Sequence, residues 1–123
     1  MTPFSLLRGL AGLSLAEAAE VLGVRLDSAK SWSSGRSACP EGALADLKSL
    51  IASQERAAAE ALAMMREQAA RFSPGAIEIG APREDAEAQR LGWPCVGAWG
   101  GMAARVIAAA PVPVKLVPRN ATP

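Results

Sequence analysis

The stretch EAAEVLGVRLDSAKSWSSGRSACP, residues 17–40, combines an alanine-rich amphipathic turn, a tryptophan and a local excess of basic side chains. Residues 21–40 contain three basic side chains and one acidic side chain, although the whole chain of 123 residues has a net charge of only +1. Because the chain as a whole is nearly neutral, no global field attracts a polyanion. The basic segment therefore indicates a local binding surface.

In the same stretch, small, glycine and apolar residues are spaced as expected for two short helices that cross at a steep angle. Such a unit requires a small residue at the crossing, a permissive residue at the turn and apolar anchors on both helices. Ala19 suits the crossing and Gly23 suits the turn. The apolar anchors are Ala18 and Leu22 on the first helix, and Val24, Ala29 and Trp32 on the second. We therefore predict a helix-turn-helix unit, although an alanine-rich hairpin with solvated charges would show similar spacing.

The second helix of this unit leaves a polar set of side chains that can donate hydrogen bonds to phosphate and base edges. The candidate DNA-binding residues are Arg25, Asp27, Ser28, Lys30, Ser31, Ser33 and Arg36. We expect Arg25 and Lys30 to face the DNA groove and Arg36 to lie near the phosphate backbone. The spacing from Val24 and Ala29 places Trp32 on the inner face, so we expect it in the core.

The segment LSLAEAAEVLGVRLDSAKSWSSGRSACPEGALADL, residues 13–47, resembles the lambda-repressor-like, or Cro/C1-type, DNA-binding domains. With the long helix and small αβ tail that follow, the chain is similar to two-domain repressors that include the anti-CRISPR-associated regulators of phages. The resemblance implies a transcriptional repressor encoded by a phage or mobile element. The chain departs from the family pattern at Arg25, where many relatives have a Ser or Thr cap, and at Ser33, where Glu is usual. Asp27 can cap the second helix instead, which would shorten the helix.

A long helix is expected after residue 40, because Pro40 suits a first helical position. Apolar residues then recur at spacings of three, four or seven and form a stripe. The stripe consists of Leu44, Leu47, Ile51, Ala58, Leu62, Met65, Ala69 and Phe72. The break SPG at residues 73–75 ends this region.

Beyond the break, residues 76–79 and 112–117 alternate like strands and flank two predicted helices, residues 82–92 and 98–110. We predict a mainly α fold with two domains. Residues 1–72 are expected to form the helix-turn-helix DNA-binding domain with a long fourth helix, and residues 73–123 a small β-α-α-β dimerisation element. Two short strands need partners, so this element should pack on the long helix, on its copy in a second subunit, or on both.

The tail carries more apolar surface than so small an element can cover. We therefore predict a homodimer interface formed by Trp93, Trp99, Met102, Val106 and Ile107. A dimer would hold two recognition helices about 34 Å apart, which is one turn of DNA. The expected partner is double-stranded DNA with a palindromic, inverted-repeat operator.

Other classes of site find little support in the composition. The chain has no His, so Cys39 and Cys95 cannot complete a usual zinc site, and we expect both thiols to be reduced. The acidic residues Glu84, Asp85 and Glu87 fit a solvated helix start better than a metal site. We expect no cofactor and no metal, and without an activating imidazole we expect no enzyme.

No export signal stands out near the N-terminus, and the most apolar window, residues 96–114, is interrupted by Arg105 and two prolines. We therefore expect a cytoplasmic protein without a membrane span. Two alternatives remain open. The chain could be the antitoxin of a toxin–antitoxin pair, with a C-terminal region that binds the toxin, or it could bind RNA through the same basic face.

Overall fold

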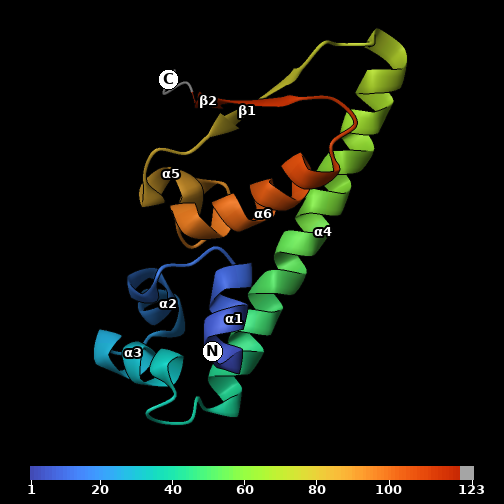
Figure 1. Ribbon diagram of the computed structural model, residues 1–123. Coiled ribbons are helices and arrows are strands. Elements are labelled where there is room, and N and C mark those ends of the chain that lie inside the picture. Colours follow the sequence, from blue (N-terminus) through green and yellow to red (C-terminus); the bar gives the residue numbers. More distant parts are fainter. Residues whose placement is uncertain (120–123) are drawn as a thin grey trace.

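The computed structural model describes residues 1–119 and is mainly helical, with a small two-stranded sheet (Figure 1). Helix α4 (Glu41–Phe72) has 32 residues and runs the length of the molecule. Beside its first half lie α1 (Pro3–Leu10), α2 (Leu15–Leu22) and α3 (Leu26–Ser34). Beside its second half lie β1 (Ile77–Ala81), α5 (Asp85–Arg90), α6 (Val96–Ala109) and β2 (Val114–Pro118).

Helices α1 and α2 begin at capping boxes. In a capping box, the side chain of the N-cap residue and that of the third helical residue each accept a hydrogen bond from the other residue's backbone N–H group. At α1, Thr2 accepts a hydrogen bond from the Ser5 N–H at 3.1 Å. At α2, Ser14 pairs in the same way with Glu17. Gly23 ends α2 in the left-handed region (φ 67°), which glycine adopts without steric cost. These signals explain why α2 ends at Gly23, the predicted turn.

Helix α4 begins at Glu41, so Pro40 is its N-cap and not its first helical residue as expected. The apolar stripe is confirmed over most of its length, with the side chains of Leu47, Ile51, Ala58, Leu62 and Met65 buried. Phe72 does not belong to it. Its side chain is 70% exposed, because the last turn of α4 extends past the cluster of buried residues that ends at Met65.

The two strands pair with each other in parallel, from Ile77 opposite Val114 to Ala81 opposite Pro118. A parallel pair needs a long crossover connection, which α5 and α6 supply. Ile77, Ile79 and Val114 pack against buried residues of α4 and α6. The expected β-α-α-β order is therefore confirmed, and the element packs on the long helix within the chain.

Two clusters of buried apolar residues stabilise the structure, and α6 contributes to both. Ala98, near the start of α6, packs in the first cluster with Phe4, Ala18 and Leu47. Val106, about two turns further on, packs in the second cluster with residues of α4. Because one helix spans both clusters, the C-terminal element is anchored to the three small helices as well as to α4. No helix in residues 1–119 is both long enough and apolar enough to cross a membrane.

Candidate nucleic-acid interface

Helices α2 and α3 are joined by a turn of three residues, 23–25, and pack closely against each other. Ala18 and Ala19 of α2 are 0% and 4% exposed, and Ala29 of α3 is 0% exposed. The Val24 N–H donates a hydrogen bond to the Ala19 carbonyl at 2.9 Å, which closes the turn. The small residues that were expected at the helix contact are therefore buried there.

The inner side of α3 is fixed by an aromatic contact with α1. The rings of Phe4 and Trp32 meet edge to face, with centroids 5.6 Å apart and an angle of 76° between the planes. Phe4 is 1% exposed, and Trp32 packs against the same cluster with its ring partly buried. Trp32 was expected in the core, and the structure bears this out in part, because the side chain packs against the core but is only partly buried. The aromatic pair determines which side of α3 faces outward.

The outer side of α3 carries the charged residues of the predicted set. Arg25, Asp27, Lys30 and Arg36 are exposed. The serines of the set are less accessible, since Ser28, Ser31 and Ser33 are only partly exposed. The Ser33 carbonyl also accepts a hydrogen bond from the Thr2 hydroxyl at 3.2 Å. The predicted residues thus share one helix and its exit, with the charged members most available to a partner.

Helix α3 begins at Leu26, with Arg25 as its N-cap and no side-chain hydrogen bond to the cap. Asp27 lies within the first turn, so the alternative in which Asp27 caps a shorter helix is wrong. Since no side chain caps them, the first amide groups of α3 are free to bind an anion such as a phosphate. The Asp27 carboxylate opposes this attraction locally.

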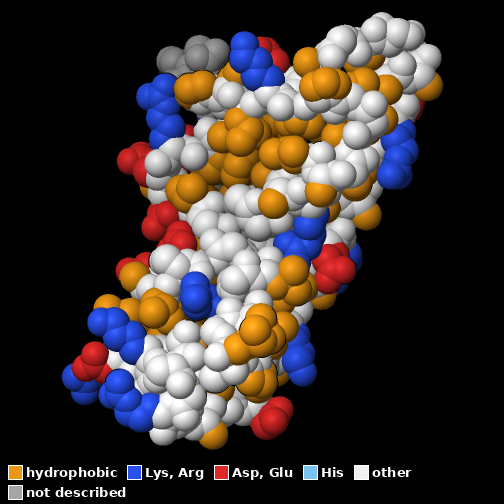
Figure 2. Space-filling view, viewed as in Figure 1, with side chains coloured by type: hydrophobic (Ala, Val, Ile, Leu, Met, Phe, Trp, Pro, Cys, Tyr) orange, Lys and Arg blue, Asp and Glu red, His pale blue; other side chains and the backbone are white. Residues whose placement is uncertain are grey.

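Positive charge is concentrated around α3. Residues 25–36 contain three of the 13 basic residues and one of the 12 acidic residues, so this segment carries +2. The other 10 basic and 11 acidic residues leave −1 for the rest of the chain. Within residues 1–119 the one ion pair joins Arg71 and Glu67 of α4, so the cations of this segment are not neutralised by an ion pair. Figure 2 shows several Lys and Arg side chains at the α3 end of the molecule.

The predicted dimer interface requires a correction. Trp99 and Val106 are 7% and 1% exposed within the single chain. Val106 packs with buried residues of α4. Trp93 and Met102 are partly covered by the same two clusters. Only Ile107, which is 43% exposed, keeps the accessibility that an interface residue needs.

The cysteines and the acidic residues at the start of α5 are the other candidate reactive groups. Burial raises the pKa of the Cys95 thiol to about 11, and burial together with nearby Glu41 raises the pKa of Cys39. Both thiols are free. Asp85 instead accepts a hydrogen bond from the Val96 N–H at 2.9 Å, at the start of α6. In the described part of the chain, no three Cys, Asp or Glu residues are grouped so that they could hold a metal ion.

One buried polar residue, Gln54, was not predicted as part of a site. Gln54 lies midway between Ile51 and Ala58 on the apolar stripe of α4 and is 0% exposed. Its Nε2 group donates hydrogen bonds to the carbonyls of Ala11 and Ala98, each at 2.9 Å. A polar residue within an apolar stripe indicates a buried polar contact, but the partners depend on the tertiary fold.

Comparison with known proteins adds no family assignment: no protein-family model matches the chain, and no curated protein sequence matches it.

Proposed function

We propose that this protein is a sequence-specific DNA-binding repressor that binds an inverted-repeat operator as a homodimer. The observation that carries the proposal is the orientation of α3. Its apolar residues Ala29 and Trp32 face the core, while Arg25 and Lys30 are exposed beside uncapped amide groups. A helix in this orientation can enter the major groove with its N-terminal half leading.

The connection between α2 and α3 supports the same proposal. Two helices of eight and nine residues, joined by a three-residue turn that begins with a left-handed Gly23, support a helix-turn-helix unit. Arg36 follows the end of α3 and would contact phosphate. An Arg36→Ala variant should bind all DNA sequences more weakly and lower the slope of log affinity against log salt by about one.

A homodimer is proposed because one small domain makes too few contacts for operator-level specificity, whereas two linked domains act together. The accessible side of α6 offers a surface for this contact. A groove of about 570 Å³ between α1 and α6 is lined by Leu10, Gly100, Ala104 and Ala108, among others. Leu10, in the groove, is 55% exposed, and Ile107 of α6 is 43% exposed.

Random-site selection on the purified protein tests the DNA proposal. An enriched palindrome supports a dimeric repressor, and the absence of any enriched sequence contradicts it.

Sedimentation at the protein concentration that saturates the selected site tests the dimer. Ala104→Glu should produce monomers, whereas Ala59→Glu, on an exposed position of α4, should not. A wild-type protein that is monomeric at that concentration would contradict the proposed assembly.

A further inference from the structure

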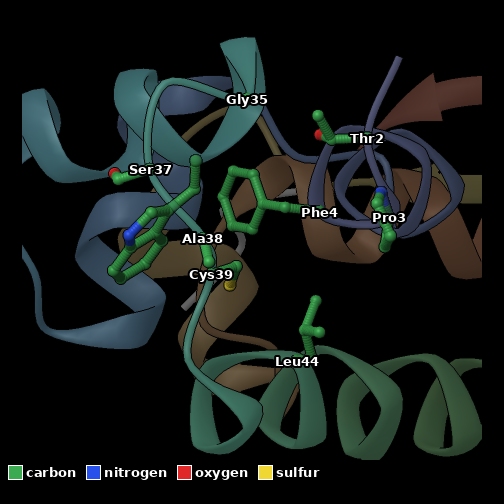
Figure 3. Close-up of a pocket in the computed structure, with 9 residues that line it drawn as sticks. Thr2, Pro3, Phe4, Gly35, Ser37, Ala38, Cys39 and Leu44 are labelled. Carbon is green, nitrogen blue, oxygen red and sulfur yellow. The ribbon is translucent and has the colours of Figure 1, made fainter.

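A pocket of about 330 Å³ lies beside the end of α3 (Figure 3). Its walls come from the start of α1, the end of α3, the loop over residues 35–39 and the first turn of α4. Leu44 points from α4 toward Phe4 and Cys39, which lie on the opposite side of the pocket. Its volume falls at the lower end of the range of roughly 300–1,000 Å³ that is typical of small-molecule sites.

The lining favours an uncharged occupant. No acidic or basic side chain contributes to the walls, which combine Phe4, Trp32, Pro3 and Leu44 with a few hydroxyl and thiol groups. The pKa of the Cys39 thiol is raised by its burial and by Glu41, so this thiol is neutral at physiological pH. A charged ligand would lose hydration without gaining an ion pair, which is unfavourable.

The lining also favours an aromatic occupant. Phe4 and Trp32 already form an edge-to-face pair, and a third ring beside them would extend this arrangement. We infer that the pocket binds a small, neutral, planar aromatic molecule.

The place of the pocket suggests a consequence for α3, and this second part of the inference rests on the proposed function. The Thr2 hydroxyl, in the pocket wall, donates a hydrogen bond to the Ser33 carbonyl in the last turn of α3. Gly35, which ends α3, is so close that an added Cβ would lie 3.4 Å from the Thr2 methyl group. A molecule that separates α1 from this turn would shift α3, so that the occupied and empty proteins bind the operator with different affinity.

The test is an NMR titration of the full chain, labelled with ¹⁵N, with 2-naphthol as the neutral probe. Saturable shifts should appear at Phe4, Trp32, Cys39 and Leu44, and 2-naphthoate, which has the same rings and a carboxylate, should bind roughly tenfold more weakly or worse. Equal binding of the two probes, or shifts confined to the groove beside α6, would overturn the inference. If the same signals shift with protein concentration alone, a second copy fills the pocket, and the inference is again wrong.

Matched variants locate the probe. Leu44→Phe places a ring in the pocket and should lower 2-naphthol affinity roughly tenfold, whereas Ala45→Phe adds the same ring to the exposed side of α4 and should not. If Leu44→Phe fails to fold, Ala38→Leu fills the pocket from the loop. A folded, pocket-filling variant with wild-type affinity would overturn the inference.

The effect on DNA is measured separately, with the selected operator and saturating 2-naphthol. If 2-naphthol changes the operator affinity of the wild type but not that of the pocket-filling variant, the regulatory part is supported. Saturable 2-naphthol binding with unchanged operator affinity would reject only that part. Failure of the proposed function is distinguishable from both outcomes, because the chain would then bind no operator even without the probe.

Discussion

The Glu17 carboxylate accepts a hydrogen bond from the Gly97 N–H at 3.0 Å and thereby joins α2 to the first turn of α6. The same carboxylate accepts a hydrogen bond from the Ser14 N–H at 2.9 Å and one from the Cys95 thiol. One side chain therefore completes the cap of α2 and also fixes α2 against the C-terminal element. If α3 reads DNA, this contact helps to set its position relative to the rest of the molecule.

The Glu17 contacts predict a pH dependence of stability. Burial alone would raise the pKa of Glu17, but the hydrogen bonds from Ser14, Gly97 and Cys95 lower it below the ordinary value of 4.5. A carboxyl group with a lowered pKa in the folded state stabilises the fold above its unfolded pKa, and this contribution is lost as the pH falls through the lowered value. Glu17→Gln should therefore reduce the free energy of unfolding at pH 7 and give a shallower decline below about pH 4.5.

Urea denaturation across this pH range measures the effect. Glu20→Gln is the matched control, because Glu20 is an exposed residue of the same helix. A Glu17→Gln curve that runs parallel to the wild-type curve at every pH would show that this carboxylate is not linked to folding.

Two neighbouring glycines of α6 should respond in opposite directions to alanine. A Cβ atom at Gly101 would lie 2.5 Å from both the Ala11 carbonyl oxygen and Gln54 Nε2, whereas a Cβ at Gly100 meets nothing within 4 Å. Gly101→Ala should lower the free energy of unfolding by about 1–3 kcal/mol. Gly100→Ala should raise it by up to about 1 kcal/mol, because alanine favours the helix. Equal effects in chemical denaturation would contradict the close approach of α6 to the end of α1.

Gln54 provides a third test, of the polar contact between the two halves of the chain. Its Oε1 atom also accepts a hydrogen bond from Arg105 at 3.3 Å, so the side chain connects α4, α6 and the end of α1. Gln54→Leu should cost about 1–3 kcal/mol, because it removes a buried donor from the Ala11 carbonyl. Gln68→Leu, on an exposed position of α4, is the control and should be close to neutral. Calorimetry that finds the two variants equally stable would argue against the network.

Trp32 should contribute to stability and not directly to DNA contact. Trp32→Ala removes a partly buried ring together with its edge-to-face contact with Phe4, at a cost of about 3 kcal/mol. Trp32→Phe should recover part of this loss. Thermal unfolding measures both effects. A Trp32→Ala protein that melts like the wild type but no longer binds DNA would show that the ring is a surface contact.

Much of the fold follows from local signals in the sequence. The helix ends near Ser14, Gly23, Gly35 and Phe72 depend on caps and on breaks in periodicity, which adjacent residues determine. The order of the C-terminal elements also follows from periodicity. The candidate site was predicted by the same logic, because the burial of Ala29 and Trp32 determines which residues of α3 remain exposed.

The parts that were not predicted depend on contacts between distant segments. Trp99 and Val106 have the character of interface residues in the sequence, but both are buried within the single chain. No local pattern predicts that Glu17 contacts Gly97, because 80 residues separate the two in the sequence. Similarly, the apolar stripe on α4 continues to Phe72 in the sequence, although the cluster of buried residues that packs on it ends at Met65.

The central claim is that the exposed side of α3 reads DNA, and the affinity of Lys30→Ala for two duplexes tests it most directly. Fluorescence anisotropy at fixed salt compares the selected operator with a scrambled duplex, and Lys48→Ala, an exposed lysine of α4, is the control. Lys30→Ala should lose about 1–3 kcal/mol of binding free energy on the operator and far less on the scrambled duplex, while Lys48→Ala keeps wild-type discrimination. Unchanged affinities of Lys30→Ala for both duplexes would contradict the assignment of α3 as the recognition helix.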